Sequence, residues 1–478
     1  MARDNQDLTK GPLARKILFF SAPLIVSNLL QVLFNVADIA VVGRFAGASA
    51  LGSVGSTTIL VTMFTSFLIG VSGGINVLTA LYLGSGDRKG VRETVHSAFL
   101  FSILTGLTLL LIGAIFSKGI LELLNTKPEL IDGAVLYIRI YFLGMPALAV
   151  YNFGNAVFSA AGDTKRPLKY LSMAGVVNII LNLFFVIVCK MDVAGVAVSS
   201  IISQYLSAAM ISVALFRSGD IYGLHRSELR LNRNKTVNII RIGIPAGLQN
   251  AIFQIANLFV QAGVNSFDAT MVAGNAAAAN ADALVYDVMT AFYTACGSFM
   301  GQNFGAGNRK RVRNSYLISL AYSFGIGMIM GLGLVLFGHQ FLSLFSTDAD
   351  VIEAGMIRLS IMGVCYGFSA FMDCTIMASR ALGKSMIPMV IVIIGSCVFR
   401  VVWIYTVFAY FTPYYPCIPF IYFHGGSQPL QKSFILFTFT KKECAEAHSF
   451  FLCLIVHDAT YISCEFKIAP NRCLVFEC

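Results

Sequence analysis

Apolar stretches of about 20 residues or more follow one another along most of the chain, separated by short polar connections. A stretch of this length crosses the hydrocarbon core of a bilayer as a helix, which satisfies its own backbone hydrogen bonds there. Charged residues make up only 12% of the 478 residues, too few to cover a soluble protein of this size. The sequence therefore predicts an all-α integral membrane protein and excludes soluble, collagen-like, disordered and disulfide-stabilised classes.

Eleven spans can be read from the apolar stretches and the Gly-, Asp-, Asn- and Pro-containing loops between them. They cover residues 17–43, 52–83, 95–117, 134–161, 168–190, 193–216, 238–267, 272–303, 315–338, 352–379 and 387–411. The longest polar connection, residues 217–237, separates an N-terminal lobe at 1–216 from a C-terminal lobe at 238–411. A twelfth span is missing or altered.

Basic residues gather in alternate connections between the spans. The other connections hold only Arg44, Lys118, Lys127 and Lys190. Because positive loops stay in the cytoplasm, this asymmetry predicts a cytoplasmic N-terminus, a cytoplasmic 217–237 linker and a multi-pass protein of the plasma (inner) membrane. The net charge of +10 is then explained by topology and by attraction to membrane lipids, without a nucleic-acid partner.

The two halves of the chain repeat one another at an offset of about 220 residues. Gly84-Ser-Gly-Asp-Arg-Lys-Gly-Val-Arg92 returns as Gly305-Ala-Gly-Asn-Arg-Lys-Arg-Val-Arg313. Three further pairs return in the same order: Pro23 and Asn28 as Pro245 and Asn250, Arg139 and Gly144 as Arg358 and Gly363, Gly162 and Pro167 as Gly383 and Pro388. An even number of spans per half makes the repeat parallel, so we expect two six-helix lobes related by an axis along the membrane normal, as in two-lobed secondary transporters. A duplicated bundle without a transport role is the plainer alternative.

The duplicated loops occur together with three further motifs. These are Asn35-Val-Ala-Asp-Ile-Ala-Val-Val-Gly43, Gly301-Gln-Asn-Phe-Gly-Ala-Gly307 and Arg380-Ala-Leu-Gly-Lys-Ser-Met-Ile-Pro388. With this combination the chain resembles the multidrug and toxic compound extrusion (MATE) family over about residues 10–411. The resemblance implies twelve transmembrane helices in two lobes. It also implies export of cationic, amphipathic small molecules in exchange for H⁺ or Na⁺.

Asp38 is the first candidate for ion coupling. An ionised side chain at the centre of an apolar helix costs about 2.5–3.5 kcal/mol on insertion scales, so such a residue is usually paired, protonated or functional. The alternative interpretation is an acid at a helix end near the interface, since Gly43 and Arg44 follow closely. The resemblance implies that Asp38 is the first-helix acid that binds the coupling ion.

Asn178 and Asn182 lie four residues apart and so on one face of the fifth span. Their amide oxygens are suited to completing a cation site or holding a protonated Asp38, and ordinary interhelical hydrogen bonding is the alternative. The family commonly has Asn and then Asp here, so Asn182 removes one negative charge and weakens the expectation of a Na⁺ site. Ser200 keeps the hydroxyl of a position where the family often has Thr. The resemblance also implies that the first helix bends at Pro23 when the acid is protonated, a static kink being the alternative.

The C-terminal half carries further intramembrane charges at Asp287, Asp373 and Arg400. A salt bridge between Arg400 and one of the two acids is the favoured interpretation, and Asp282 is expected on the pore-facing surface of the eighth span. An acid near Pro245 that the family would supply is absent, with Gln249 and Gln254 in its place. A coupling site in the first lobe is therefore favoured over one in the second.

We accordingly predict a monomeric secondary antiporter with Asp38 as its coupling acid and with no cofactor beyond the coupling ion, H⁺ or Na⁺. A flippase for a lipid-linked precursor is the competing function, since Arg139, Arg358 and Arg400 are suited to holding a pyrophosphate. An enzyme is not expected, because no catalytic or metal-binding constellation lies within the spans.

The sequence changes character after about residue 411. Residues 412–478 hold six of the 11 cysteines but only two of the 42 glycines, and their apolar runs are too short to span. A frameshift near residue 411 is one hypothesis for this atypical or disordered tail, and a divergent authentic tail is the other. A metal site built from His424, Cys444, His448, Cys453 and His457 is a minor alternative, and no metal is expected elsewhere.

Overall fold

The structure is a computed structural model that describes residues 7–124 and 126–408, and in these ranges it is helical without strands. The first half comprises α1 (Leu13–Val41), the π-helix η1 (Val42–Ala46), α2 (Gly47–Ser85), α3 (Arg88–Leu123), α4 (Pro128–Phe142), α5 (Met145–Ala160), α6 (Lys165–Leu183), the π-helix η2 (Phe184–Val188) and α7 (Asp192–Phe216). A connection containing the short helix η3 (Arg226–Glu228) leads to the second half. That half comprises α8 (Arg233–Val264), α9 (Ala269–Gly305), α10 (Arg309–Leu336), α11 (Gly338–Leu342), α12 (Ala349–Ala381), α13 (Met386–Val392), the π-helix η4 (Ile393–Val398), α14 (Phe399–Trp403) and the π-helix η5 (Ile404–Phe408).

The predicted all-α membrane fold is confirmed. Nine of the described helical segments are long and apolar enough to cross a membrane, or ten spans result if the bent pair α4–α5 counts as one. With 37 residues α9 is also long enough, but it is not among these segments, and its sequence mixes alanines with Asn and Asp. The place of a twelfth span, like the 412–478 tail and its His and Cys residues, lies outside the described residues.

The predicted span at 134–161 is not one straight helix. α4 ends at Phe142, α5 begins at Met145, and the two are bent by 47°. Pro146 lies in the first turn of α5, where its missing N–H needs no partner but where it cannot continue the preceding helix. In the repeat, Gly363 takes the place of Gly144 without a following proline, and α12 runs unbroken through it.

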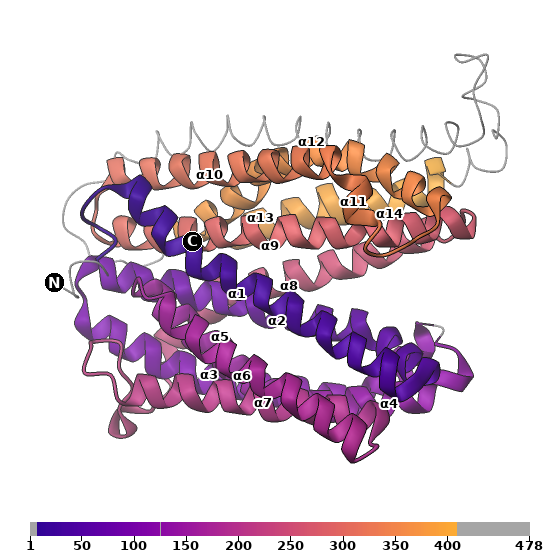
Figure 1. Cartoon of the computed structure of the whole chain (residues 1–478). Coiled ribbons are helices and arrows are strands. Elements are labelled where there is room, and N and C mark those ends of the chain that lie inside the picture. Colours follow the sequence, from indigo (N-terminus) through magenta and orange to yellow (C-terminus); the bar gives the residue numbers. More distant parts are fainter. Residues whose placement is uncertain (1–6, 125, 409–478) are drawn as a thin grey trace.

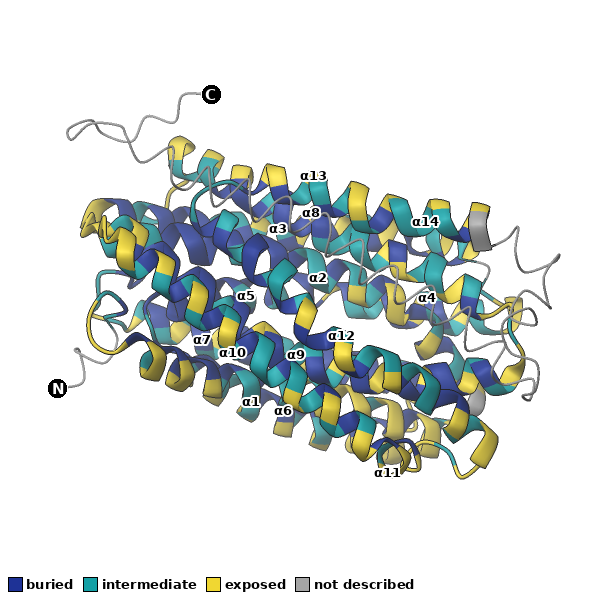
Figure 2. Ribbon diagram, turned by 90° about the horizontal axis from the view of Figure 1, so that it is seen from above, coloured by how far each residue is buried: buried dark blue, intermediate teal, exposed yellow. Residues whose placement is uncertain are grey.

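Figure 1 shows the helices gathered into two groups, the N lobe (α1–α7) and the C lobe (α8–η5), which diverge from one end of the molecule toward the other. Each lobe's first helix begins packed against the opposite lobe. Phe20 of α1 contacts Phe299 of α9 edge to face, with ring centroids 5.4 Å apart. In the repeat-related place, Ile239 and Ile242 of α8 pack into the N-lobe core around Val95. Figure 2 shows the buried positions concentrated between the helices.

The lobes meet along a glycine seam, formed by Gly70, Gly74 and Gly84 of α2, Gly243 and Gly247 of α8, and Gly301 and Gly305 of α9. These glycines are spaced so that their backbones touch the opposite lobe. A Cβ added at Gly74 would lie 2.6 Å from the Cα of Gly243, and one at Gly84 would lie 1.8 Å from the carbonyl oxygen of Gln302. Small residues four apart allow this close helix packing in membranes, where lipid gives little hydrophobic drive for association.

Two asparagine clamps mark the end of the seam. Asn28 of α1 donates its side-chain N–H to the backbone oxygen of Asp287 on α9, at 2.7 Å. Asn250 of α8 donates in the same way to the backbone oxygen of Ser66 on α2, at 3.2 Å. Since Asn28 and Asn250 are repeat partners, and Ser66 and Asp287 are 221 residues apart, the two hydrogen bonds are related by the internal repeat. The repeat found in the sequence is therefore also present in the contacts between the lobes.

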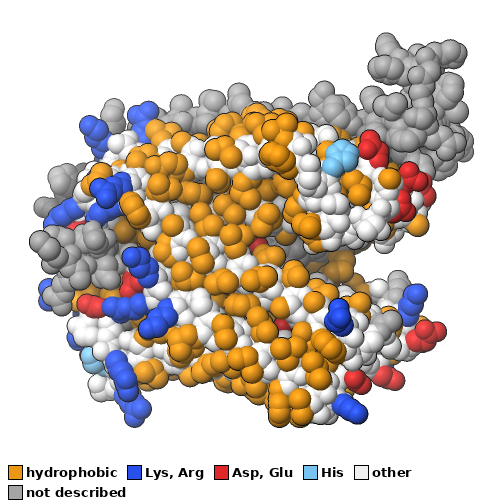
Figure 3. Space-filling view, in the orientation of Figure 1, with side chains coloured by type: hydrophobic (Ala, Val, Ile, Leu, Met, Phe, Trp, Pro, Cys, Tyr) orange, Lys and Arg blue, Asp and Glu red, His pale blue; other side chains and the backbone are white. Residues whose placement is uncertain are grey.

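Beyond the clamps the lobes separate and leave a cleft. Gly55, in the part of α2 beyond Ser66, is exposed. Figure 3 shows a notch between the lobes at this end of the molecule, and most of the visible Lys and Arg at the other end. We call the latter the basic end. The cleft is thus closed at the basic end and open at the opposite end.

The segment at residues 7–12 closes the basic end further. Leu8 is buried, its backbone N–H donates to Gln302 of α9, and its carbonyl oxygen accepts from Asn303 and Arg311. Arg311 also donates to the carbonyl oxygen of Gly11, at 2.9 Å. In the repeated loop motif the position equivalent to Arg311 is a glycine, so this contact belongs to the C lobe alone.

Removing the tight fit of the glycine seam should destabilise the protein. Gly84→Ala brings a methyl group onto the Gln302 backbone, and overpacking of this kind costs about 1–3 kcal/mol. We expect a lower melting temperature in detergent. Gly73→Ala on the same helix is the control, because nothing lies within 4 Å of its added Cβ. Equal melting temperatures for the two variants would contradict the role of the seam.

Arg311 should hold the N-terminal segment in place. Arg311→Gln removes the guanidinium contacts to Leu8 and Gly11, so we expect faster hydrogen exchange in a peptide containing these residues, measured by mass spectrometry. The matched control is Arg313→Gln in the same motif, at an exposed side chain. Unchanged exchange in Arg311→Gln would show that other contacts fix the segment.

Candidate functional site

A cluster of polar side chains lies inside the N lobe, between α1, α6 and α7. Asp38 comes from the last turns of α1, and Asn178 and Asn182 come from one face of α6. Ser200 and Ser203 come from α7. The Asn and Ser side chains are buried, Asn182 completely. The structure thus brings together all four residues predicted for the coupling site.

Hydrogen bonds connect the members of this N-lobe cluster. The side-chain N–H of Asn182 donates to the Asp38 carboxylate and lies 3.3 Å from the Asn178 oxygen. Asn178 donates to the Ser203 hydroxyl, also at 3.3 Å, and the Ser200 hydroxyl bonds to Asp38. Ser203 was not predicted. Its position three residues after Ser200, on the same face of a helix, is the signal that identifies it.

Neutral groups surround the Asp38 carboxylate. In the described part of the chain no Lys or Arg forms an ion pair with it, and its hydrogen-bond donors are an amide and a hydroxyl. Tyr137 and Tyr141 of α4 lie near enough to feel the Asp38 charge, and their rings stack on each other at 5.9 Å. The Asn182 oxygen is buried and accepts no hydrogen bond from the described residues. The cluster therefore contains one carboxylate and an amide oxygen with free capacity to accept.

Two π-helical segments follow the cluster. α1 passes into η1 just after Asp38, and α6 passes into η2 directly after Asn182 and Leu183. The wider turn of a π-helix misaligns part of the α-helical hydrogen-bond ladder, and such segments occur frequently at functional sites. Neither π-helical segment was predicted from the amino-acid sequence.

Pro23 lies in the middle of α1, which is helical on both sides of it. The proline ring removes one backbone hydrogen bond, and the carbonyl oxygen of Pro23 accepts from the Ser27 hydroxyl at 3.0 Å. Its repeat partner Pro245 lies inside α8 in the same way. Neither proline ends its helix.

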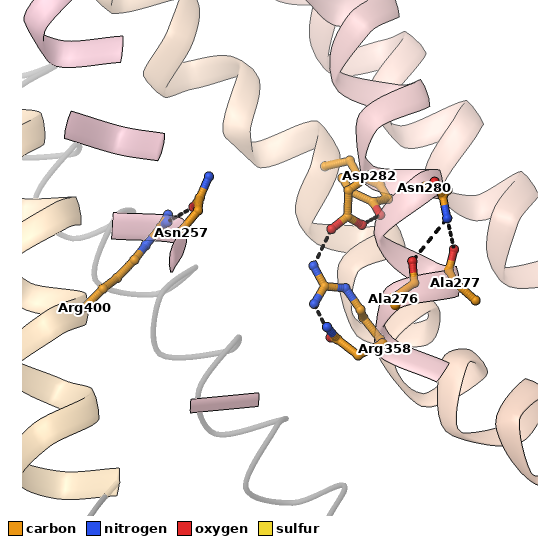
Figure 4. A network of polar contacts seen from close by, with 9 residues as sticks. Asn257, Ala276, Ala277, Asn280, Asp282, Arg358 and Arg400 are labelled. Carbon is orange, nitrogen blue, oxygen red and sulfur yellow. Dashed lines mark hydrogen bonds and ion pairs between the residues drawn. The ribbon is translucent and has the colours of Figure 1, made fainter. Parts of the chain in front are cut away.

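The C lobe contains a separate ionic network between α9 and α12. Arg358 donates to both Asp282 and Asn275, and the Tyr366 hydroxyl donates to Asp282 (Figure 4). The side chains of Arg358 and Asp282 are 20% and 15% exposed. Asp282 was expected on the pore-facing surface of its span, and the structure adds that α12 supplies its two partners, Arg358 and Tyr366.

The predicted salt bridge of Arg400 is wrong. Arg400 of α14 donates to the Asn257 oxygen at 3.2 Å, and its guanidinium lies over the Phe253 ring (Figure 4). No ion pair joins it to Asp287 or Asp373 among the described residues. The correction has a geometric reason: Asn257 and Phe253 both come from α8, the helix that packs against this segment.

The remaining intramembrane acids differ in their surroundings. Asp373 of α12 is half-buried near Tyr293 and Arg380, and Arg380 donates to Gln249 at 3.0 Å. Asp287 of α9 is half-buried, and its carboxylate makes no hydrogen bond or ion pair within the part of the chain that the structure describes. Gln249 thus bonds to an arginine at a place where the resemblance would supply an acid.

Within the part of the chain that the structure describes, a grouping of possible metal ligands occurs at the basic end. Ligand atoms of His96, His225 and Glu228 lie within 4.8 Å of one another. The structure satisfies them without an ion, however, because His96 Nε2 accepts from the His225 backbone N–H at 2.9 Å and Glu228 pairs with Arg92. The grouping fixes the connection between the lobes onto α3.

A two-lobed helical bundle with an inner polar cluster and a cleft open at one end defines a membrane transporter of the alternating-access class. The MatE family model matches the chain twice, at residues 23–184 and 245–406, once in each lobe. The chain therefore belongs to the MatE family, the family that its loop motifs resemble. Members of this family are transporters rather than enzymes.

Two curated relatives cover most of the chain. "Probable multidrug resistance protein YpnP" of Bacillus subtilis is 30% identical over 370 residues, 76% of this chain and 81% of the relative. The "FAD transporter" of Shewanella oneidensis is 24% identical over 402 residues, 83% of this chain and 87% of the relative.

Solved structures share the fold. A multidrug resistance MATE family transporter of the MOP superfamily, described in an outward-facing conformation, superimposes with a TM-score of 0.85 at 19% identity and covers 97% of this chain and 99% of its own. At this level of identity the likeness concerns the fold alone. The chain is thus a multi-pass membrane protein of a family of small-molecule efflux transporters.

Proposed function

We propose that the protein exports cationic, amphipathic small molecules by antiport, with Asp38 as the group that carries the coupling ion. The observation behind this proposal is a single intramembrane carboxylate held by neutral donors, Asn182 and Ser200, within one lobe of a transporter fold. A carboxylate without a fixed countercharge changes its charge when it binds a proton or a cation. Its charge state then decides whether a cationic substrate is retained.

We propose H⁺ as the coupling ion. Ionised Asp38 accepts from the Asn182 amide as found here, and rotation of that amide would present its unused oxygen to a protonated Asp38. Both charge states would then be hydrogen-bonded, which is the requirement for a carboxyl group that titrates away from water. Sodium is the alternative, because Asn178, Asn182 and Ser200 supply further side-chain oxygens in the same cluster as Asp38. With Asn182 in place of an acid, the site offers Na⁺ only one negative charge.

The orientation of the cycle follows from the charge asymmetry. With the basic end in the cytoplasm, the cleft opens to the outside, and the glycine seam and the segment at residues 7–12 close the cytoplasmic side. Protonation of Asp38 from the outside would release the substrate. A bend of α1 at Pro23 is the conformational step we propose to follow, since the proline leaves one backbone carbonyl of α1 without its helical donor.

The flippase alternative receives little support from the arginines. Arg139 is an exposed residue of α4 in the N lobe, Arg358 is bound to Asp282, and Arg400 contacts Asn257. A pyrophosphate site needs several cations directed at one point. A relative named as a FAD transporter nevertheless makes anionic compounds a necessary control in transport assays.

Asp38→Asn tests the proposed coupling. The variant keeps the shape and the hydrogen-bonding capacity of the side chain but can no longer bind a proton, so we expect efflux driven by a pH gradient to fall to background in proteoliposomes. Equal protein incorporation and downhill substrate counterflow are the controls for folding. Full pH-driven efflux of organic cations by Asp38→Asn would refute the coupling role.

Asn182→Asp tests the choice of ion. A second carboxylate beside Asp38 gives the site a second negative charge with which to bind Na⁺. Two adjacent acids bind a cation or a proton because this relieves their repulsion. We expect wild-type efflux to respond to a pH gradient and not to a Na⁺ gradient, and the variant to gain a response to Na⁺. Sodium-driven efflux by the wild type would reverse the assignment.

A further inference from the structure

Asp287 lies where the two lobes part. Its backbone oxygen accepts the Asn28 clamp, at the end of the glycine seam and at the beginning of the cleft. Asp38 follows ten residues later on α1, about 15 Å further toward the open end at the helical rise. Asp287 is therefore deep in the cleft, near the part of the lobe interface that any change of access must rearrange.

The Asp287 carboxylate is not used by the fold. The clamp involves the main chain, and the side chain is half-buried without a hydrogen bond or ion pair among the described residues. Two other intramembrane acids in this range are engaged, Asp38 by Asn182 and Asp282 by Arg358, and Asp373 has the charge of Arg380 nearby. At the repeat-related position Ser66 uses its hydroxyl to accept from Gln254, at 3.4 Å. An acid thus stands where the symmetric half has a small, satisfied hydroxyl.

Polar side chains share the Asp287 face of α9 with Ala283, Leu284 and Ala291. Asn280, Thr290 and Thr294 lie within about 60° of Asp287 around the helix, at spacings of seven, three and seven residues. Asn280 and Thr290 are exposed, while Asp287 and Thr294 are half-buried. These polar groups are costly against lipid and are suited to a water-filled cleft.

We propose that Asp287 binds the cationic centre of the transported molecule at the deep end of the cleft. An ammonium or phosphonium cation would contact the carboxylate there, and the Asn280 amide and Thr290 hydroxyl would line its approach. Asp38 lies too far along α1 to contact the same cationic centre, so the two acids divide the work: Asp287 recognises the substrate and Asp38 carries the coupling ion. This assignment rests on the proposed export of organic cations.

Two variants can distinguish a substrate-binding role of Asp287 from a structural role. Asp287→Asn removes the charge but keeps the backbone carbonyl that accepts the Asn28 clamp, so the lobe interface is retained. The repeat offers a second variant, Asp287→Ser combined with Ser66→Asp, which moves the carboxylate to the equivalent point on α2. Because Asn250 bonds only to the backbone of Ser66, the second clamp also survives this exchange.

Equilibrium binding of tetraphenylphosphonium to the purified full-length protein in detergent tests the proposal. At a pH where the wild-type Asp287 carboxylate is ionised, we expect Asp287→Asn to weaken binding roughly 10- to 100-fold, the range for losing a contact to a charged group. The pH dependence of the remaining binding should persist, because Asp38 is intact. Asp38→Asn should show the opposite pattern, with the pH dependence lost. Asp287→Glu and the double exchange should recover much of the affinity, which a merely structural role would not predict.

Two outcomes would overturn the proposal and can be told apart. Unchanged tetraphenylphosphonium affinity in Asp287→Asn, with Asp38→Asn still uncoupled, would refute the role of Asp287 and leave the proposed function standing. A wild-type protein that neither binds nor exports tetraphenylphosphonium or other organic cations would refute both. Melting temperatures of all variants within a few degrees of the wild type establish that binding, and not folding, is being compared.

Discussion

The contact on which this structure depends is the backbone-to-backbone approach of α2 to α8 and α9 along the glycine seam. Between helices in a bilayer the gain comes from close packing, because lipid tails are as apolar as the side chains they would replace. Glycine permits that packing because it places no Cβ between the touching backbones. Larger side chains such as Phe20 and Phe299 then add interlobe contacts beside the seam. A closure of this kind must separate at both types of contact if it opens in each transport cycle.

The position of the seam also determines where charge can be used. Closed packing at the basic end leaves the opposite halves of α1 and α9 beside a cleft. An acid on either helix is then reachable from water although it lies at membrane depth, which lowers the cost of an ionisable group there. Asp38 is turned into its own lobe and is held by Asn182, whereas Asp287 stays at the lobe interface. The same fold thus provides one acid that is hydrogen-bonded within a lobe and one acid at the interface between the lobes.

Much of the fold was predictable from the sequence, and about half of the polar organisation. Hydropathy and the repeat predicted the helices and the two lobes, because polar backbone and charge are costly in hydrocarbon. The cost argument also selected Asp38, and helical spacing brought Asn178 and Asn182 to one face. Neither argument could identify the partners of the charged residues in the C lobe. Arg358 and Arg400 are both long enough to reach several helices, and only packing decides that Asp282 pairs with Arg358. Glycines four apart were visible as well, but with 42 glycines in the chain the spacing did not reveal a seam.

At some repeat-related positions the two halves make the same backbone contact but carry different side chains. Asn28 and Asn250 make the same hydrogen bond, so the duplication preserved the clamp, yet the acceptor residues are Asp287 in one half and Ser66 in the other. In the loop motif, Arg311 holds the N-terminal segment while its counterpart Gly90 lies against Tyr82 and Asp87. Symmetry in the main chain maintains a closure that both lobes share. Differences between side chains then allow each lobe a different role, because a charged residue in one half can have an uncharged residue at the equivalent position of the other half.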